Sequence, residues 1–121
     1  GPVFDFERIF VCRGVRPDGD GFNAEGIGFS HPSSLPHLLL FGHVLGARVS
    51  RAVHVYVEIE AVAQEIGPVL QQTYRLHPGS HPDRRMFLGV VRVRGELDPR
   101  HYQAIIRVEN WAEARTGFEI V

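Results

Sequence analysis

The stretch VHVYVEIEAVA, residues 53–63, decides the fold class. Every odd-numbered position in it is apolar, whereas the even-numbered positions up to residue 60 carry the polar or aromatic side chains His54, Tyr56, Glu58 and Glu60. Successive side chains of an extended strand point to opposite faces, so this alternation is typical of a strand with one buried and one solvated face. We therefore predict a half-buried β-strand over this stretch.

Alternation with a period of two recurs elsewhere in the chain, over residues 4–12, 86–94, 101–109 and 112–120. In the second of these stretches the parity of the apolar positions changes near Gly89. An extra residue in one strand of a pair produces such a change. We therefore predict a β-bulge at that glycine.

The first stretch has apolar residues on both parities. The aromatic parity holds Phe4, Phe6, Phe10 and Cys12, and the other parity ends in Ile9 and Val11. We therefore expect both faces of this strand to be covered by other parts of the protein towards its C-terminal end. Cys12 is expected to be a packed thiol, because a cysteine on an apolar face is usually inert.

Turn-forming residues separate the alternating stretches. The sequence PDGDG at 17–21 predicts a hairpin turn. Residues 30–37 and 76–83 are rich in proline, serine and histidine and predict two long loops. Between the last two strands, Glu109-Asn110 predicts a tight turn, because asparagine tolerates positive φ.

About seven or eight short strands with short connections predict an all-β fold, an antiparallel β-sandwich of the Ig-like or Greek-key type. Two stretches leave an alternative open. Asp98-Pro99 would start a helix well, although the β-branched residues that follow favour a strand over residues 100–108. Residues 61–72 could hold a short helical turn. We expect a single domain over residues 3–121, since Gly1-Pro2 is typical of the scar left by tag removal.

The composition excludes several classes of protein. The chain has 121 residues, of which 44% are hydrophobic, with a net charge of −1, so it is too apolar for a disordered chain and has no strong overall field. Its single cysteine excludes an intramolecular disulfide and a cysteine-based zinc cluster, and favours a cytoplasmic location. No apolar stretch is long enough to span a membrane, so no membrane partner is expected. All 13 basic residues are arginine, which excludes lysine-based chemistry.

Histidines gather in the two predicted loops. His31 and His37 lie in the first, and His77 and His81 lie in the second. If both loops lie at the same end of the fold, two to four imidazoles could converge on a metal ion. The alternative is that they are solvated loop residues, because three of them precede proline. A metal-binding protein or metal-dependent enzyme is thus one possible function; otherwise no cofactor is expected.

Arginines are concentrated in the second part of the chain. Residues 1–74 hold five arginines and eight acidic residues, a net of −3, and residues 75–121 hold eight arginines and six acidic residues, a net of +2, which together give −1. The densest group is Arg84, Arg85, Arg92 and Arg94. This group is a candidate partner-binding patch.

The arginine group has two interpretations. If the strand bearing Arg92 and Arg94 pairs with the strand bearing Glu58 and Glu60, the charges cancel as cross-strand pairs, and this interpretation is favoured. Otherwise the group forms a patch for an acidic protein or a nucleic acid. No aromatic residues are interleaved with these arginines, which disfavours a single-stranded nucleic acid.

Nothing in the sequence indicates nucleophilic catalysis. There is no Gly-x-Ser-x-Gly motif, and no catalytic residues are assigned. A sandwich has exposed strand edges, and the two parts of the chain carry opposite charge, which suits self-association or addition of a partner strand. We therefore expect a non-catalytic binding or assembly module whose partner is a protein or a second copy, so that a homodimer is possible. An arginine-mediated nucleic-acid binder is the third alternative.

The order of features resembles a group of small bacterial single-domain β-sandwich proteins of unknown function. The residues that carry the resemblance are the strand FVCRGV at 10–15, the stretch 22–29 after the glycine-rich turn, the loop ending at Pro36 and the closing hairpin over 101–121. The resemblance implies a single sandwich domain in a bacterial protein. It carries over no functional residue.

Overall fold

The computed structural model describes residues 4–19, 21–35, 37–46, 52–63, 67–76, 85–94, 97–110 and 112–121. Within these ranges the chain is all-β, as predicted, and it has ten strands and no helix. The strands are β1 (Phe4–Cys12), β2 (Gly14–Asp18), β3 (Gly21–Glu25), β4 (Ser30–His31), β5 (His37–Gly46), β6 (Val53–Ala61), β7 (Pro68–Leu76), β8 (Arg85–Arg94), β9 (His101–Val108) and β10 (Ala112–Ile120). None of the described segments is thus a helix long and apolar enough to cross a membrane.

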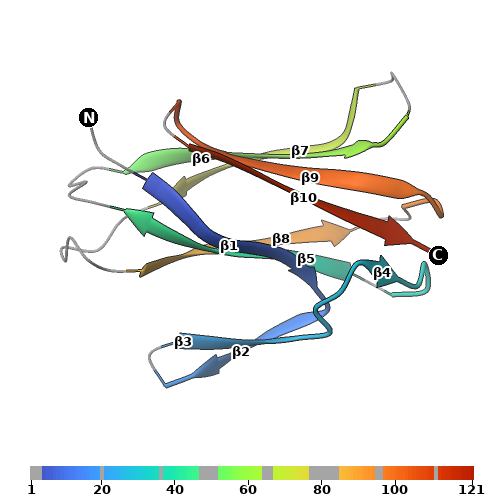
Figure 1. Cartoon of the computed structure of the whole chain (residues 1–121), viewed down its shortest axis with the longest axis horizontal. Helices are drawn as coiled ribbons and strands as arrows, with labels where there is room; N and C mark the ends of the chain where they lie inside the picture. The colour runs from blue at the N-terminus through green and yellow to red at the C-terminus, as the bar shows by residue number, and fades with distance from the viewer. Residues whose placement is uncertain are drawn as a thin grey trace.

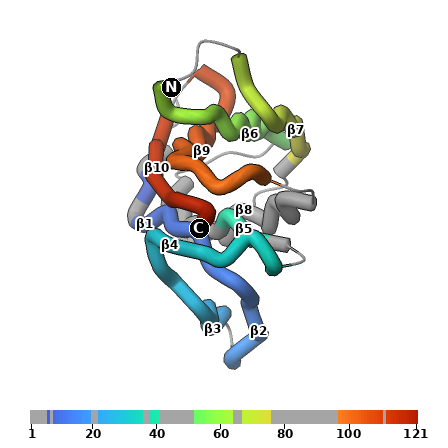
Figure 2. Tube along the Cα trace, turned by 90° about the vertical axis from the view of Figure 1, so that its right-hand side faces the viewer, coloured from blue at the N-terminus to red at the C-terminus, as the bar shows by residue number. Residues whose placement is uncertain are grey.

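The strands form three sheets. One has five strands in the order β4-β10-β9-β6-β7, one has three in the order β1-β5-β8, and β2 pairs only with β3 among the described strands. Figure 1 shows the two larger sheets lying over each other, with the β2–β3 hairpin on the far side of the three-stranded sheet. Figure 2 shows the same layers after a quarter turn.

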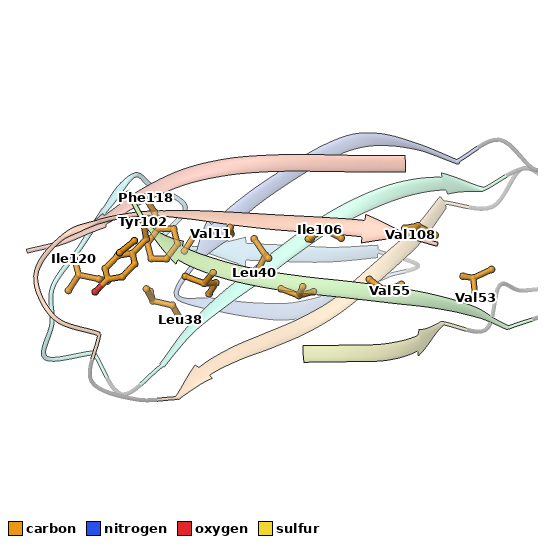
Figure 3. Close-up of a cluster of buried hydrophobic side chains, with 14 residues drawn as sticks. Val11, Leu38, Leu40, Val53, Val55, Tyr102, Ile106, Val108, Phe118 and Ile120 are labelled. Carbon is orange, nitrogen blue, oxygen red and sulfur yellow. The ribbon is translucent and has the colours of Figure 1, made fainter. Parts of the chain in front are cut away.

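The main core lies between the two larger sheets. In β6 the odd-numbered residues from Val53 to Ala61 are all buried, which confirms the half-buried strand predicted there. Facing side chains of the three-stranded sheet join them, and Figure 3 shows several members of this cluster. Its buried members are Val11, Leu38, Leu40, Val53, Val55, Val57, Ile59, Ala61, Tyr102, Ala104, Ile106, Val108, Phe118 and Ile120.

A second, smaller core lies on the other face of the three-stranded sheet. Phe10, Cys12 and Leu39 are buried there, with Val15 and Ala24 of the β2–β3 hairpin packed against them. Both faces of β1 are thus covered towards its end, as predicted. A two-stranded hairpin is only marginally stable by itself in water, so it packs its apolar side against the three-stranded sheet.

A β-bulge in β1 divides its aromatic residues between the two cores. The register with β5 shifts between Phe6 and Arg8, so residues on either side of this point exchange faces. Phe6 packs on the main core together with Ile9, whereas Phe10 belongs to the smaller core. Placing Phe6 and Phe10 on one face was therefore wrong.

Cys12 is fully buried, and burial raises the pKa of its thiol. We expect the native thiol to resist Ellman's reagent and to react once the chain is unfolded in guanidinium.

In the unfolded chain the thiol ionises at its usual pKa of about 8.5, while the buried thiol stays protonated. The free energy of unfolding should therefore fall as the pH rises above about 8.5, and less steeply in Cys12→Ala. Native labelling as fast as that of the unfolded chain would contradict this.

Two of the predicted irregularities are present. Leu40 pairs with Val91 and Gly42 with Leu88, so two residues of β8, Gly89 among them, lie opposite one residue of β5. This register confirms the predicted bulge. In the β2–β3 hairpin Asp18 pairs with Gly21, as the glycine-rich turn predicts.

The closing hairpin is also present, with a change in its turn. Residues 101–108 form a strand rather than a helix, and Val108 pairs with Ala112. The positive φ, 49°, lies at Glu109 and not at Asn110 as predicted. Glu109 is held there by His54, whose backbone N–H donates to the Glu109 side chain (3.0 Å) and whose carbonyl accepts from the Glu109 N–H (2.9 Å).

One strand pairing is parallel. The two-residue strand β4 runs parallel to the end of β10, with Ser30 opposite Glu119 and His31 opposite Ile120. The described chain therefore has mixed sheets and ten strands, where antiparallel pairing of about seven or eight was predicted. The parallel pair places the segment after β3 against the C-terminal strand.

Candidate functional site

The histidine-rich loops do not remain loops throughout. His31 lies in β4 and its side chain is completely buried. Its Nε2 atom is 2.8 Å from the carbonyl oxygen of Gly28, and its Nδ1 atom is 3.4 Å from Nε of Arg13. A carbonyl oxygen only accepts, so Nε2 carries the proton and Nδ1 accepts from Arg13. His31 is therefore a packed residue and not a solvated one.

Of the other three candidate metal ligands, the structure describes only His37. His37 is the first residue of β5 and pairs with Arg94, while His77 and His81 lie outside the described residues. Within the described part of the chain, no three histidine, cysteine, aspartate or glutamate side chains are grouped as a metal site would require. Since both ring nitrogens of His31 already contact protein atoms, a metal there would have to displace one of these partners. Convergence of the four histidines stays a prediction.

The arginine group lies mainly on β8. Arg84 is outside the described residues, and Arg85, Arg92 and Arg94 are in β8. The expected pairing of this strand with β6 is wrong. Arg92 pairs with Leu39 of β5, and Arg94 pairs with His37. The cross-strand cancellation with the β6 glutamates therefore does not occur, and binding of a partner by these arginines stays a prediction.

Glu58 of β6 has other partners. Its Oε1 atom accepts from Arg107 of β9 at 3.3 Å and from the Gln71 amide of β7 at 3.1 Å. β6 lies between β9 and β7, so residues from both neighbours reach this carboxylate. Exposed pairs of this kind contribute about 0–1 kcal/mol each. Around Glu58, positive and negative side chains therefore balance each other on the outer face of the five-stranded sheet.

A polar cluster forms where β4 meets β10. The Glu119 carboxylate accepts a hydrogen bond from the Ser30 hydroxyl, and its other oxygen is 3.2 Å from Nε2 of His101. The exposed ring of Phe29 is 5.9 Å from the imidazole of His101. Sequence reasoning missed this cluster, because its members come from three separate strand ends.

The order of contacts in this cluster matters for its chemistry. Nucleophilic catalysis requires a serine hydroxyl bonded to a histidine that is in turn oriented by a carboxylate. Here the carboxylate of Glu119 lies between Ser30 and His101, so the imidazole is not positioned to take the serine proton. The contacts instead join the β4 segment to β10 and β9.

The edge strand β7 is the most distinctive surface of the five-stranded sheet. Among the described strands it pairs with β6 alone, on one side. Its nine residues, PVLQQTYRL, contain a single charged side chain, Arg75. Natural edge strands usually carry several charges or are very short, which prevents pairing with other chains. This edge lacks that protection, and Val69 on it is 44% exposed.

Two charged side chains near this edge have no partner within the described residues. Arg75 of β7 and Glu60 of β6 make no ion pair or side-chain hydrogen bond there. They lie towards opposite ends of the β6–β7 pair, because Arg75 is opposite His54 while Glu60 is opposite Pro68. Neither charge is therefore compensated by a side chain in the described part of the chain.

No protein-family model matches the chain, and no curated protein matches it. The function therefore has to be inferred from the residues and their geometry.

Proposed function

We propose that the protein is a non-catalytic assembly module that self-associates along the edge strand β7. The observation that carries the proposal is the long, nearly uncharged edge, which offers a row of backbone donors and acceptors to an added strand. A second copy of the chain is the partner, because it presents the same edge and offers an opposite charge to both Arg75 and Glu60.

We further propose that the fold is a sandwich of the Ig-like or Greek-key type. Support comes from the two larger sheets, which share one core, and from β5 and β6, which follow each other in the chain but lie in different sheets. The buried thiol of Cys12, which forms no disulfide, supports a reducing location, and we propose the bacterial cytoplasm.

Adding a charge to the edge tests the proposal. Thr73 is an exposed residue near the middle of β7 and lies two residues from Arg75, on the same face. We expect Thr73→Lys to raise the dissociation constant of the dimer at least about tenfold, equivalent to about 1.4 kcal/mol. The reason is that two edges with added positive charge repel each other, and lysine disfavours edge pairing. Sedimentation velocity over a concentration series measures the change.

A matched lysine elsewhere on the same sheet serves as control. His101 is exposed on β9, and His101→Lys adds its lysine beside Glu119 and not on β7, so self-association should be unchanged. Circular dichroism should show that both variants are folded. A wild-type chain that is monomeric at every concentration, or equal dimerisation of both variants, would overturn the proposal.

A further inference from the structure

We infer that two copies pair their β7 strands antiparallel in one register, with Gln72 facing Gln72 across a two-fold axis. This inference rests on the proposed self-association and adds its geometry. It follows from three features of the edge: the direction of its backbone groups, the length of the strand and the position of two charges.

The backbone directions follow from the contacts of β6. Both the N–H and the carbonyl of His54 bond to Glu109, on the side of β9. Backbone groups alternate in direction along a strand, so the odd-numbered residues of β6 bond to β7. Their partners in β7 are even-numbered, as Val57 opposite Gln72 shows. From Leu70 onward the odd-numbered residues of β7, which are Gln71, Thr73 and Arg75, therefore direct their N–H and C=O groups to the open edge. The register shift between Ile59 and Glu60 leaves Val69 outside this alternation.

A symmetric pair of edges must place odd-numbered residues opposite odd-numbered ones, because only these have backbone groups at the edge. Among such registers, the one centred on Gln72 uses all nine residues, with Pro68 opposite Leu76. It also places Thr73 opposite Gln71. The two pairs of Gln71 with Thr73 lie in the regular part of the strand, and at two bonds each they supply about four backbone hydrogen bonds.

The same register brings Arg75 of one copy near Glu60 of the other. Arg75 lies opposite Val69 of the second copy, and Glu60 of that copy is on the strand behind Val69. Because Glu60 is opposite Pro68, two strand spacings and one residue step separate the Cα atoms of Arg75 and Glu60 by roughly 10 Å, which their side chains can span. The arginine stem would cover the exposed Val69 side chain on the way.

The neighbouring register, centred on Thr73, fits less well. It would place Arg75 opposite Gln71 and next to Glu58 of the second copy. Glu58 already accepts from Arg107 and Gln71 within its own chain. Glu60 would then lie away from Arg75 of the second copy, and the ends of the two strands would not overlap. The charges therefore favour the register centred on Gln72.

Disulfide trapping distinguishes the registers. The two Gln72 residues would form a non-hydrogen-bonded pair with Cα atoms about 4.5 Å apart, which a disulfide can bridge. The two Thr73 residues would be offset by two positions and roughly 8 Å apart, beyond that reach. In full-length Cys12→Ala protein, we expect Gln72→Cys to give a covalent dimer under mild oxidation and Thr73→Cys to give little.

Charge exchange provides the second measurement. We expect Arg75→Glu and Glu60→Arg each to raise the dissociation constant about tenfold at low salt, and the double variant to restore it to within about threefold. Trapping at residue 73, or no rescue in the double variant, would overturn the register while leaving self-association standing. A wild-type dimer that Thr73→Lys leaves unchanged would overturn the use of β7 altogether, and a monomeric wild type would overturn both proposals.

Discussion

Replacing Phe118 with alanine is expected to lower the free energy of unfolding by about 3–5 kcal/mol. Phe118 is 1% exposed in the main core, and its ring stacks on Tyr102 with centroids 5.5 Å apart. Removing the ring loses its transfer free energy and leaves a cavity between the two sheets. Tyr102 would also lose its stacking partner, although its hydroxyl still donates to the carbonyl of Asp98 (2.7 Å).

The magnitude is a large share of a small domain's total stability of about 5–15 kcal/mol, so the variant could be partly unfolded. Phe118→Leu keeps most of the volume and is expected to lose only about 1–2 kcal/mol, which keeps the prediction measurable. Phe29→Ala is the matched control, because that ring is 51% exposed and should change stability by less than about 1 kcal/mol. Urea unfolding followed by circular dichroism measures all three. Equal losses at Phe118 and Phe29 would show that the core is placed wrongly.

Replacing His31 with alanine is expected to cost about 2–4 kcal/mol. Its ring is completely buried, and truncation would leave both a cavity and an unpaired carbonyl at Gly28. The backbone of His31 also accepts from the N–H of Val121 at 2.9 Å, so loosening of β4 should reach the end of the chain. Hydrogen exchange at Val121 should therefore accelerate together with the loss of stability.

A conservative variant separates the hydrogen bond from the packing. His31→Gln places an amide donor near the position of Nε2, so it should recover part of the loss. Arg13 is exposed, and a long hydrogen bond of 3.4 Å links its Nε atom to the ring, so Arg13→Ala should cost less than His31→Ala. Were His31→Ala as stable as the wild type, the histidine would not be the packed residue described above.

Much of the secondary structure could be predicted from local pattern. The strand at Val53–Ala61 and the strand at His101–Val108 both follow from alternation with a period of two. The bulge near Gly89 followed from a change of parity within one strand. Each of these features depends on residues that are neighbours in the chain, which explains why the sequence indicates it.

Features that join distant residues could not be predicted in this way. Alternation shows that a strand has a buried face, but it does not show which strand lies beside it. The favoured pairing of the Arg92 strand with the Glu58 strand is therefore wrong, because Arg92 pairs with β5. Alternation likewise does not indicate that Arg107 is the ion-pair partner of Glu58. The same holds for the carboxylate of Glu119 between Ser30 and His101.

Gly26 illustrates the same limit. In the sequence it is one of 13 glycines. In the fold its φ is +64°, and an added Cβ would lie 2.7 Å from Cδ of Arg13. Arg13 in turn contacts the buried His31. The requirement arises because the chain brings Arg13 and Gly26 together at the base of the β2–β3 hairpin.

By itself the sequence determined that the chain is built of strands, which faces of most of them are buried, and that its charges are unevenly divided. The tertiary structure alone decided that β7 is an edge, that His31 is buried, and that Arg75 and Glu60 lack partners among the described residues. The physical reason is that face alternation is a property of one extended segment. Strand order depends instead on how all the segments together bury their apolar faces in a shared core.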